Sequence, residues 1–320
     1  MKPLMIFKRF VLVLLGTLSL SQCTMLIGSF DECEQTADCW QLYERNDLSC
    51  QEQQCVIHEL YSQCQTIVGN TDSELTDDEV ITFGAVMAMS TPEGASNPRG
   101  EFRSKALELG YGHFNQRGGV NDKEFRVRVC DHQGDSEKVA ELTEYLVNER
   151  KVPLLVTSGS QDTINASTVT ILAKTLLISI SATSPELRGL NDNGLVWRMS
   201  PSDALVGKAA AESVNVPEQT QAPSFGIIYI SDVYGDGLQN EFKKVYQELY
   251  PGASVSSYSF QSNDQSSIDN ALSNIKDANP SKLFVIAFSG DGSYIANQLA
   301  SNANLSELPR NCEIFFADSV

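Results

Sequence analysis

The chain has 320 residues, of which 42% are hydrophobic and 20% charged. This composition is typical of a globular protein of roughly one to three domains and excludes a collagen-like, disordered or polytopic membrane chain. The formal net charge is −18, from 23 Lys and Arg against 41 Asp and Glu. Because sequence-independent nucleic-acid binding requires clustered cations, this charge argues against a nucleic-acid partner.

The N-terminus predicts export. Basic residues up to Arg9 precede an apolar run of about eleven residues, 10–20, which is too short to span a membrane and is typical of a signal peptide. The run ends in Leu20-Ser21-Gln22-Cys23, which resembles a bacterial lipobox except for Gln22, where a small residue is usual. We expect a lipoprotein signal peptide at 1–22 and a lipid anchor on Cys23. The alternative is a standard signal peptide, with Cys23 in a disulfide.

A Cys-rich module is predicted for residues 23–65. Aliphatic residues are sparse there, so the segment needs staples in order to fold. We expect Cys33, Cys39, Cys50 and Cys55 to form two disulfides, in one of three possible connectivities. A zinc site is the competing interpretation, but paired C-x2-C knuckles are missing and export disfavours free thiolates. The polar, acidic segment 66–79 is interpreted as a linker.

From residue 80 onward, apolar runs of strand length alternate with helical segments. The strands predicted first are 80–89, 125–130, 153–157, 175–181 and 195–199, and the helices between them are 101–117, 135–150 and 162–174. After a helix start at 200–203, further strands are predicted at 225–231, 254–260, 282–288 and 313–317, with helices at 237–250, 266–279 and 292–303. The pattern predicts an α/β protein with doubly wound parallel sheets in two lobes, 80–200 and 201–320.

Ligands of such sheets bind outside the carboxyl ends of the strands, so the residues there are the candidates for a site. The sequence lacks the G-x-x-x-x-G-K-[ST], G-x-G-x-x-G and G-x-S-x-G motifs, and it has three histidines. Of these only His132 follows a strand, where we expect a solvated loop residue. We therefore predict no catalytic, metal or cofactor site. The rival hypothesis is a periplasmic hydrolase built from Asp131, Asp232, Asp236 and Asp318, which would need two carboxylates to converge.

Two neighbouring strand ends carry small hydroxyl residues. Residues 157–163 (TSGSQDT) link a strand to a helix, and residues 179–185 (SISATSP) follow the next strand. Hydroxyl and amide donors at a helix N-terminus suit an anion, so the pair suggests a carboxylate cradle. Helix capping is the other explanation for each segment.

Several segments together resemble the type I periplasmic solute-binding proteins, and most closely the branched-chain amino-acid (Leu/Ile/Val) binding proteins of ABC transporters. The segments are FGAVMAMSTP at 83–92, NQRGGV at 115–120, Val129-Cys-Asp131, SGSQDT at 158–163, ISISATSPEL at 178–187, WRMSP at 197–201 and ISDVYGDG at 230–237. The resemblance spans 80–320. It implies a two-lobed protein that binds a small amino-acid-like solute between its lobes and delivers it to an ABC permease. It also implies that the fold is C-terminally incomplete, without the return to the first lobe.

The resemblance assigns roles to individual positions. It implies a ligand site formed by Ser160 (hydroxyl to the ligand carboxylate), Gln161, Ser181 (backbone), Thr183 (amide and hydroxyl), Tyr234 (aromatic cover) and Asp318 (ligand ammonium). Two positions depart from the family, since Arg99 and Asp291 stand where it has pocket aromatics. If both face the site, a polar ligand is favoured over an aliphatic one.

Three cysteines remain after these assignments. Cys64 precedes the predicted linker and Cys130 ends a strand of the first lobe, so we predict a disulfide between them, with Cys312 left free or paired outside the present chain. The sequence thus predicts an exported, lipid-anchored solute-binding protein of the cell envelope. A ligand-sensing receptor ectodomain is the alternative that the sequence leaves open.

Overall fold

The computed structural model describes residues 32–43, 48–69, 80–214, 216, 221–301 and 312–317. The chain forms two compact units, Met1–Ser62 and Gln63–Val320. The predicted signal peptide, Cys23 and Asp318 lie outside the described residues, so the lipid anchor and the ammonium-binding role of Asp318 stay predictions. Among the described helices, none combines the length and the apolar character needed to cross a bilayer.

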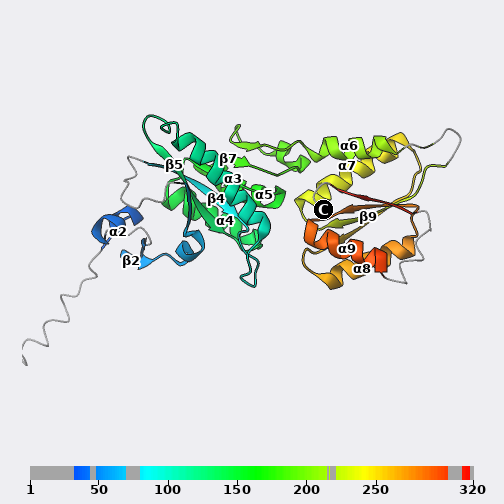
Figure 1. The fold of residues 1–320 in the computed structure, drawn as a ribbon, viewed down its shortest axis with the longest axis horizontal. Helices are drawn as coiled ribbons and strands as arrows, with labels where there is room; N and C mark the ends of the chain where they lie inside the picture. The colour runs from blue at the N-terminus through cyan, green and yellow to red at the C-terminus, as the bar shows by residue number, and fades with distance from the viewer. Residues whose placement is uncertain are drawn as a thin grey trace, which may run out of the picture. The chain divides into compact units, whose positions relative to one another are not determined.

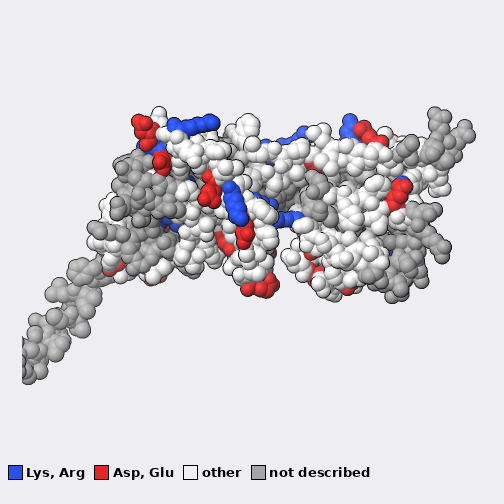
Figure 2. Space-filling model, viewed as in Figure 1, with Lys and Arg blue, Asp and Glu red and all other residues white. Residues whose placement is uncertain are grey.

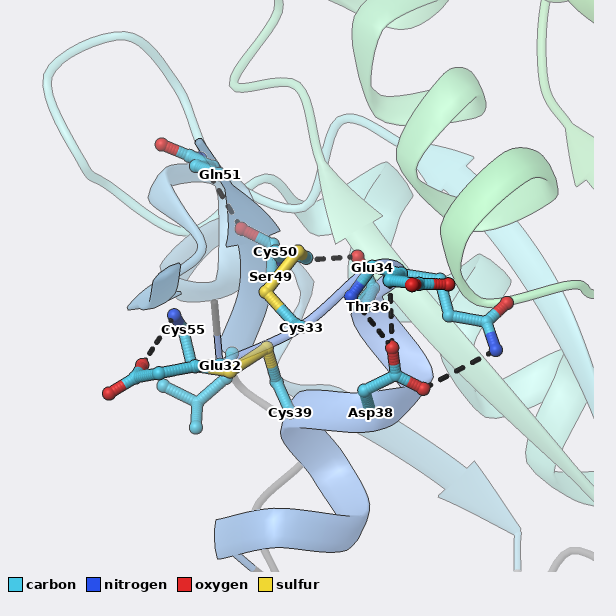
Figure 3. The surroundings of a disulfide bond; sticks show 12 residues. Glu32, Cys33, Glu34, Thr36, Asp38, Cys39, Ser49, Cys50, Gln51 and Cys55 are labelled. Carbon is cyan, nitrogen blue, oxygen red and sulfur yellow. Dashed lines mark hydrogen bonds between the residues drawn. A yellow bond between two sulfur atoms is a disulfide. The ribbon is translucent and has the colours of Figure 1, made fainter. Parts of the chain in front are cut away.

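The first unit is a small disulfide-stapled module (Figure 3). Helix α2 (Thr36–Tyr43) is followed by an antiparallel hairpin of β1 (Leu48–Gln51) and β2 (Gln54–Ile57). The bonds Cys33–Cys50 and Cys39–Cys55 join the hairpin to the helix and to the segment before it, which confirms two disulfides and selects one of the three connectivities. The sulfurs are thereby engaged, and the zinc interpretation is wrong.

Hydrogen bonds complete this module. The carboxylate of Asp38 accepts the amides of Glu34 and Gln35 ahead of α2, at 2.8 and 3.0 Å. Figure 3 shows Asp38 beneath Glu34. Cys39 is fully buried, and the indole N–H of Trp40 donates to the carbonyl of Leu48 at 2.7 Å. The 3-10 helix η2 (Glu59–Cys64) follows β2. With so few apolar side chains to bury, the two disulfides stand in for a larger core.

The second unit begins with a six-stranded sheet in the order β3-β5-β4-β6-β7-β8 (Figure 1). Its strands are β3 (Thr66–Gly69), β4 (Val80–Met87), β5 (Glu124–Asp131), β6 (Leu154–Thr157), β7 (Leu176–Ser179) and β8 (Val196–Arg198). All neighbours are parallel except β3, which pairs with β5 in antiparallel fashion. The segment 66–69, expected in the linker, is therefore an edge strand.

The disulfide Cys64–Cys130 ties the start of that edge strand to β5 and confirms the predicted bridge. The two Cα atoms lie 3.9 Å apart, and both side chains are fully buried. Beside the bridge, the buried guanidinium of Arg128 donates to the carbonyl of Cys64 at 2.9 Å. Cys312 carries no disulfide within the described part of the chain.

Helices connect the strands of the first sheet. They are α3 (Pro98–Asn115), η3 (Ser136–Lys138), α4 (Val139–Glu144), η4 (Tyr145–Glu149), α5 (Ser160–Ala173) and η5 (Pro185–Gly189). The single helix predicted for 135–150 is a succession of a 3-10 turn, an α-helix and a π-helical turn. Helix α3 starts three residues before the predicted residue 101, because the side chain of Asn97 caps it and Pro98 takes its first turn.

A four-stranded parallel sheet follows, in the order β10-β9-β11-β12. Its strands are β9 (Phe225–Ile230), β10 (Val255–Phe260), β11 (Lys282–Ile286) and β12 (Glu313–Phe316). Its helices are α6 (Asp203–Ser213), α7 (Val233–Leu249), α8 (Gln265–Ala278) and α9 (Ser289–Ser301). In Figure 1, α6 and α7 lie on one side of this sheet and α8 and α9 on the other.

The core of this sheet is aromatic on the α7 side. Phe225, Phe242 and Tyr246 are buried, with ring centroids 4.9–5.6 Å apart.

The predicted lobe boundary at residue 200 lies between β8 of the first sheet and α6, which packs on α7. On the face drawn in Figure 2, Lys and Arg side chains are interspersed with Asp and Glu over a mostly uncharged surface. The architecture is the predicted α/β fold with two doubly wound sheets. The loops that follow the carboxyl ends of their strands are where a ligand site is expected.

Candidate functional site

A cavity of about 830 Å³ lies at the carboxyl ends of strands from both sheets. Part of its lining comes from residues one or two positions after the ends of seven strands: Ala88, His132, Ser158, Ser181, Ser231, Gln261 and Phe288. Parallel strands bring their carboxyl ends to the same edge of a sheet, which is why segments far apart in the sequence meet here. Of the predicted site residues in the described part of the chain, all five line this cavity: Ser160, Gln161, Ser181, Thr183 and Tyr234.

Ser160 joins the two hydroxyl-rich loops. The residue is 3% exposed, and its Oγ accepts the backbone amides of Thr183 at 3.2 Å and Ser184 at 3.1 Å. A hydroxyl that accepts two bonds keeps its own O–H as a donor. The loops after β6 and β7 are therefore held together by one oxygen, whose proton is available to an acceptor.

The same two loops are joined a second time. The amide of Gly159 donates to Ser181 Oγ at 3.1 Å. The buried hydroxyl of Thr163, on α5, donates to Oγ of Ser179, the last residue of β7, at 2.8 Å. Gly159 has φ +82°, a left-handed conformation that favours glycine and turns the chain into α5. Helix α5 has no side-chain cap, so capping does not explain these hydroxyls. In the loop after β7, helix capping does explain Ser184, whose hydroxyl accepts the amide of Glu186 at the start of η5.

Gln161 and Tyr234 lie where the two sheets face the same cavity. Gln161 Oε1 accepts the amide of Val233 at 3.4 Å, at the first residue of α7. The Tyr234 ring is 3% exposed and is stacked on Phe288, with centroids 5.4 Å apart. Tyr234 is therefore a buried and packed part of the cavity lining, and its role as an aromatic cover stays a prediction.

The two positions that depart from the family differ in their surroundings. Arg99 lines the cavity, donates to Ser289 Oγ at 2.6 Å and lies over the Phe288 ring at 5.4 Å. Asp291 is not among the lining residues. Its buried carboxylate accepts from Ser262 Oγ at 2.8 Å and from the amide of Asn263 at 3.0 Å, so it holds the loop after β10.

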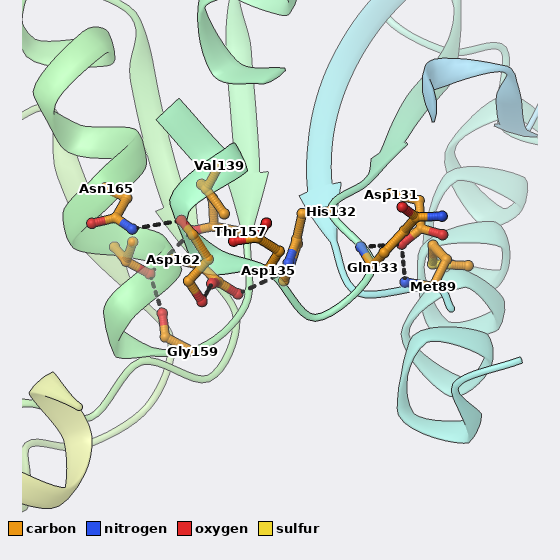
Figure 4. A network of polar contacts seen from close by, with 12 residues as sticks. Met89, Asp131, His132, Gln133, Asp135, Val139, Thr157, Gly159, Asp162 and Asn165 are labelled. Carbon is orange, nitrogen blue, oxygen red and sulfur yellow. Dashed lines mark hydrogen bonds and ion pairs between the residues drawn. The ribbon is translucent and has the colours of Figure 1, made fainter. Parts of the chain in front are cut away.

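His132 is not the solvated loop residue expected from the sequence. It is 3% exposed, and its Nε2 lies 3.3 Å from Asp162 Oδ2 (Figure 4). Asp162 also accepts from Ser136 Oγ at 2.8 Å, while Asn165 donates to the carbonyl of Ser136. His132, Asp162, Ser136 and Asn165 all line the cavity. The expectation for His132 was wrong because its loop, at the end of a strand, faces the cavity and not bulk water.

Asp131, next to His132, has a structural role. Its Oδ1 accepts the amides of Met89 and Gln133, each at 2.8 Å, as Figure 4 shows. It therefore fixes the loop after β4 against the loop after β5. Among the acids considered for a hydrolase, Asp131 and Asp236 are not among the lining residues, and Asp232 is.

Asp232 is the cavity carboxylate whose ionisation is most perturbed. Its pKa is raised to about 6, chiefly by burial and to a smaller extent by the negative charges of Asp236 and Asp162, while hydrogen bonds from the amides of Gly235 and Tyr234 act in the opposite direction. Asp232 also caps α7, since its Oδ1 accepts the Gly235 amide at 2.8 Å. The sequence signal for it was its position directly after a strand and before a helix.

The lining as a whole combines neutral donors, two arginines, a histidine and several carboxylates around one aromatic pair. This arrangement suits the binding of a small polar solute through many hydrogen bonds. Within the described residues, the one group of side chains with metal-ligand geometry is Cys33, Cys39 and Cys55, whose sulfurs are in disulfides.

Comparisons with known proteins agree with this picture. A family model described as periplasmic binding protein matches residues 80–309. A search of curated proteins found no match. Among solved structures, a branched-chain amino-acid transporter substrate-binding protein from Streptococcus pneumoniae, in complex with isoleucine, is similar with 22% identity and a TM-score of 0.58, covering 75% of this chain and 64% of that one.

Two further solved proteins have the same fold. A solute-binding protein of an ABC transporter from Rhodopseudomonas palustris, with 3,4-dihydroxybenzoic acid, is 16% identical with a TM-score of 0.58, covering 75% of this chain and 62% of that one. A fatty acid ABC transporter substrate-binding protein from Thermomonospora curvata is 18% identical with a TM-score of 0.61, covering 73% and 58%. The chain spans less than two thirds of the length of these three proteins. With the family model matching residues 80–309, and with two mainly parallel sheets whose strand ends line one cavity, the chain belongs to the periplasmic binding protein family.

Proposed function

We propose that the protein is an exported lipoprotein that binds a small amino-acid-like solute in the cavity and delivers it to an ABC transporter. The observation that carries the proposal is the convergence of donors from neighbouring loops on one cavity. Ser160, Ser181 and Thr183 all line it, and they belong to loops that hydrogen bonds hold in fixed register. Hydroxyl donors held in place in this way suit a carboxylate, because their conformational freedom is already restricted before the ligand binds.

The solutes of similar proteins support the carboxylate part of the proposal. Isoleucine and 3,4-dihydroxybenzoic acid are bound in two of the similar structures, and a third protein is described as serving a fatty acid transporter. These compounds differ in size and polarity, and a carboxylate is what they share. We expect the same group at the loops after β6 and β7.

The envelope location and the anchor belong to the same proposal. The Leu20-Ser21-Gln22-Cys23 segment supports lipidation at Cys23, and the three disulfides suit an oxidising compartment. Mass spectrometry of the protein from membranes is expected to find a diacylated N-terminal Cys23. An intact leader, or cleavage elsewhere with an unmodified Cys23, would remove this part of the proposal.

The test is calorimetric titration of the purified protein with the amino acids, their amides and simple carboxylic acids. We expect the best ligand to bind at least about tenfold more weakly to Ser160→Ala and Thr183→Ala, since each removes a hydrogen bond to a charged group, worth about 1.5–3 kcal/mol. Decarboxylated analogues are expected to lose more. Unchanged binding in both variants would show that the site lies elsewhere.

A matched control separates binding from folding. Ser167 is also buried on α5, but its hydroxyl donates to the carbonyl of Ile164 in its own helix and does not line the cavity. Ser167→Ala should therefore leave the affinity unchanged. Thermal unfolding of each variant shows whether the substitution also destabilises the fold.

A further inference from the structure

Two arginines from one helix line the cavity. Arg99 and Arg103 stand one turn apart on α3, so their side chains project from the same face of the helix. Burial lowers the pKa of the Arg103 guanidinium, the nearby charge of Arg99 lowers it further, and the charge of Asp162 opposes both effects. An arginine stays protonated despite such shifts, so two positive charges face the cavity from this helix.

The nearby charge of Asp162 partly compensates for the burial of Arg103, but it does so without an ion pair. Within the described part of the chain, no carboxylate forms an ion pair with it. Two carboxylates that line the cavity have other cationic or polar partners, Asp162 with His132 and Asp135 with Lys138. A partly buried charge without an ion-pair partner is unfavourable, and an anion supplied from outside would remove that penalty.

We propose that Arg103, with Arg99 beside it, forms an anion subsite distinct from the hydroxyl loops, and that the solute carries two carboxylates. The class is an acidic amino acid or a small dicarboxylic acid. This inference rests on the proposed function, in which the loops after β6 and β7 take the first carboxylate. The second carboxylate binds the guanidinium groups of α3, which follows β4 and not β6 or β7.

The chemistry of the two subsites differs. Ser160 and Thr183 offer neutral donors, which also accept an uncharged carbonyl. A guanidinium binds a carboxylate through two parallel hydrogen bonds and distinguishes it from an amide, whose NH2 group would face the arginine as a second donor. A site with buried donors of this kind rejects the analogue that leaves them unpaired.

The test uses acid and amide pairs of equal shape. Calorimetry would compare glutamate with glutamine, aspartate with asparagine, and succinate with succinamate. We expect the acid of the best pair to bind at least tenfold more tightly than its amide. In Arg103→Gln that ratio should fall toward one, mainly through loss of affinity for the acid, and Arg103→Lys should keep part of it.

The control is Lys105→Gln, which removes one positive charge from the same helix at an exposed position outside the cavity. It should leave the ratio unchanged, and thermal unfolding identifies any variant that is misfolded. Equal binding of acid and amide by the native protein, or equal weakening of both by Arg103→Gln, would overturn the inference. If a monocarboxylate binds and Ser160→Ala weakens it while the ratio stays at one, the proposed function survives and the second subsite fails. If no carboxylate binds, both fail.

Discussion

The hydroxyl of Ser160 supports the fold and faces the cavity at the same time. It accepts two backbone amides of the neighbouring loop, and those amides would be left without that acceptor in an alanine variant. A residue of this kind has a stability effect and a binding effect that point in the same direction. Comparison with Ser167, which is similarly buried on the same helix and is hydrogen-bonded within it, separates the two effects.

The raised pKa of Asp232 predicts that the stability of the fold depends on pH. Its folded-state pKa of about 6 lies above the ordinary value of 3.8, so the folded protein holds the proton more tightly than the unfolded chain does. Stability from this group is present below about pH 4 and is lost as the pH rises through about 6. Asn caps helices as well as Asp does and does not ionise. Between pH 4.5 and 7.5, Asp232→Asn should gain on the order of 1–3 kcal/mol in unfolding free energy relative to the native protein.

Denaturant unfolding at several pH values measures this difference. Asp264→Asn is the matched control, because Asp264 caps α8 through the amide of Ser267 but is exposed. Its unfolding free energy relative to the native protein should vary little over the same range. If both variants show the same dependence on pH, the buried charge of Asp232 is not its cause.

Helix starts show what the sequence patterns identified and what they missed. The apolar periodicity placed α3 and α7 in the right segments but began them at 101 and 237, whereas they begin at Pro98 and Val233. The missed signals were the caps Asn97 and Asp232, each of which accepts an amide of the first turn. The segment 135–150 was expected to be one helix, and local periodicity does not distinguish α-helical from π-helical turns.

We predict that removing the Cys64–Cys130 bridge destabilises the protein and loosens strand β3. The strand is four residues long and pairs with β5 alone, so the bridge is its covalent tie to the sheet. Replacing both cysteines with alanine removes a cross-link over a sequence separation of 66 residues and should lower the unfolding free energy by about 2–4 kcal/mol. Hydrogen exchange of the β3 amides should accelerate more than exchange in β4.

The matched control removes Cys33 and Cys50 instead, a bridge within the other unit. It should leave exchange in β3 unchanged while loosening the hairpin of β1 and β2. Unaltered protection of β3 without the Cys64–Cys130 bridge would mean that its pairing with β5 holds the strand by itself.

At the scale of the whole molecule, the alternation of strands and helices was sufficient to predict two doubly wound sheets and the hydroxyl loops at their strand ends. The patterns did not predict Arg103, or the partnership of His132 with Asp162. Arg103 lies within a helix rather than after a strand, and whether a helical side chain faces the cavity depends on how α3 packs. Contacts between residues 30 apart in the sequence, such as His132 and Asp162, are set by the sheet order and are invisible to local periodicity.

A crystal structure of the protein with its best-binding carboxylic solute would test the proposed site most directly. We expect the solute in the cavity of about 830 Å³, with one carboxylate within hydrogen-bond distance of Ser160 and Thr183 and its other end toward Arg103. A solute bound outside this cavity, or bound within it with no carboxylate near the loops after β6 and β7, would show that the site is wrongly assigned.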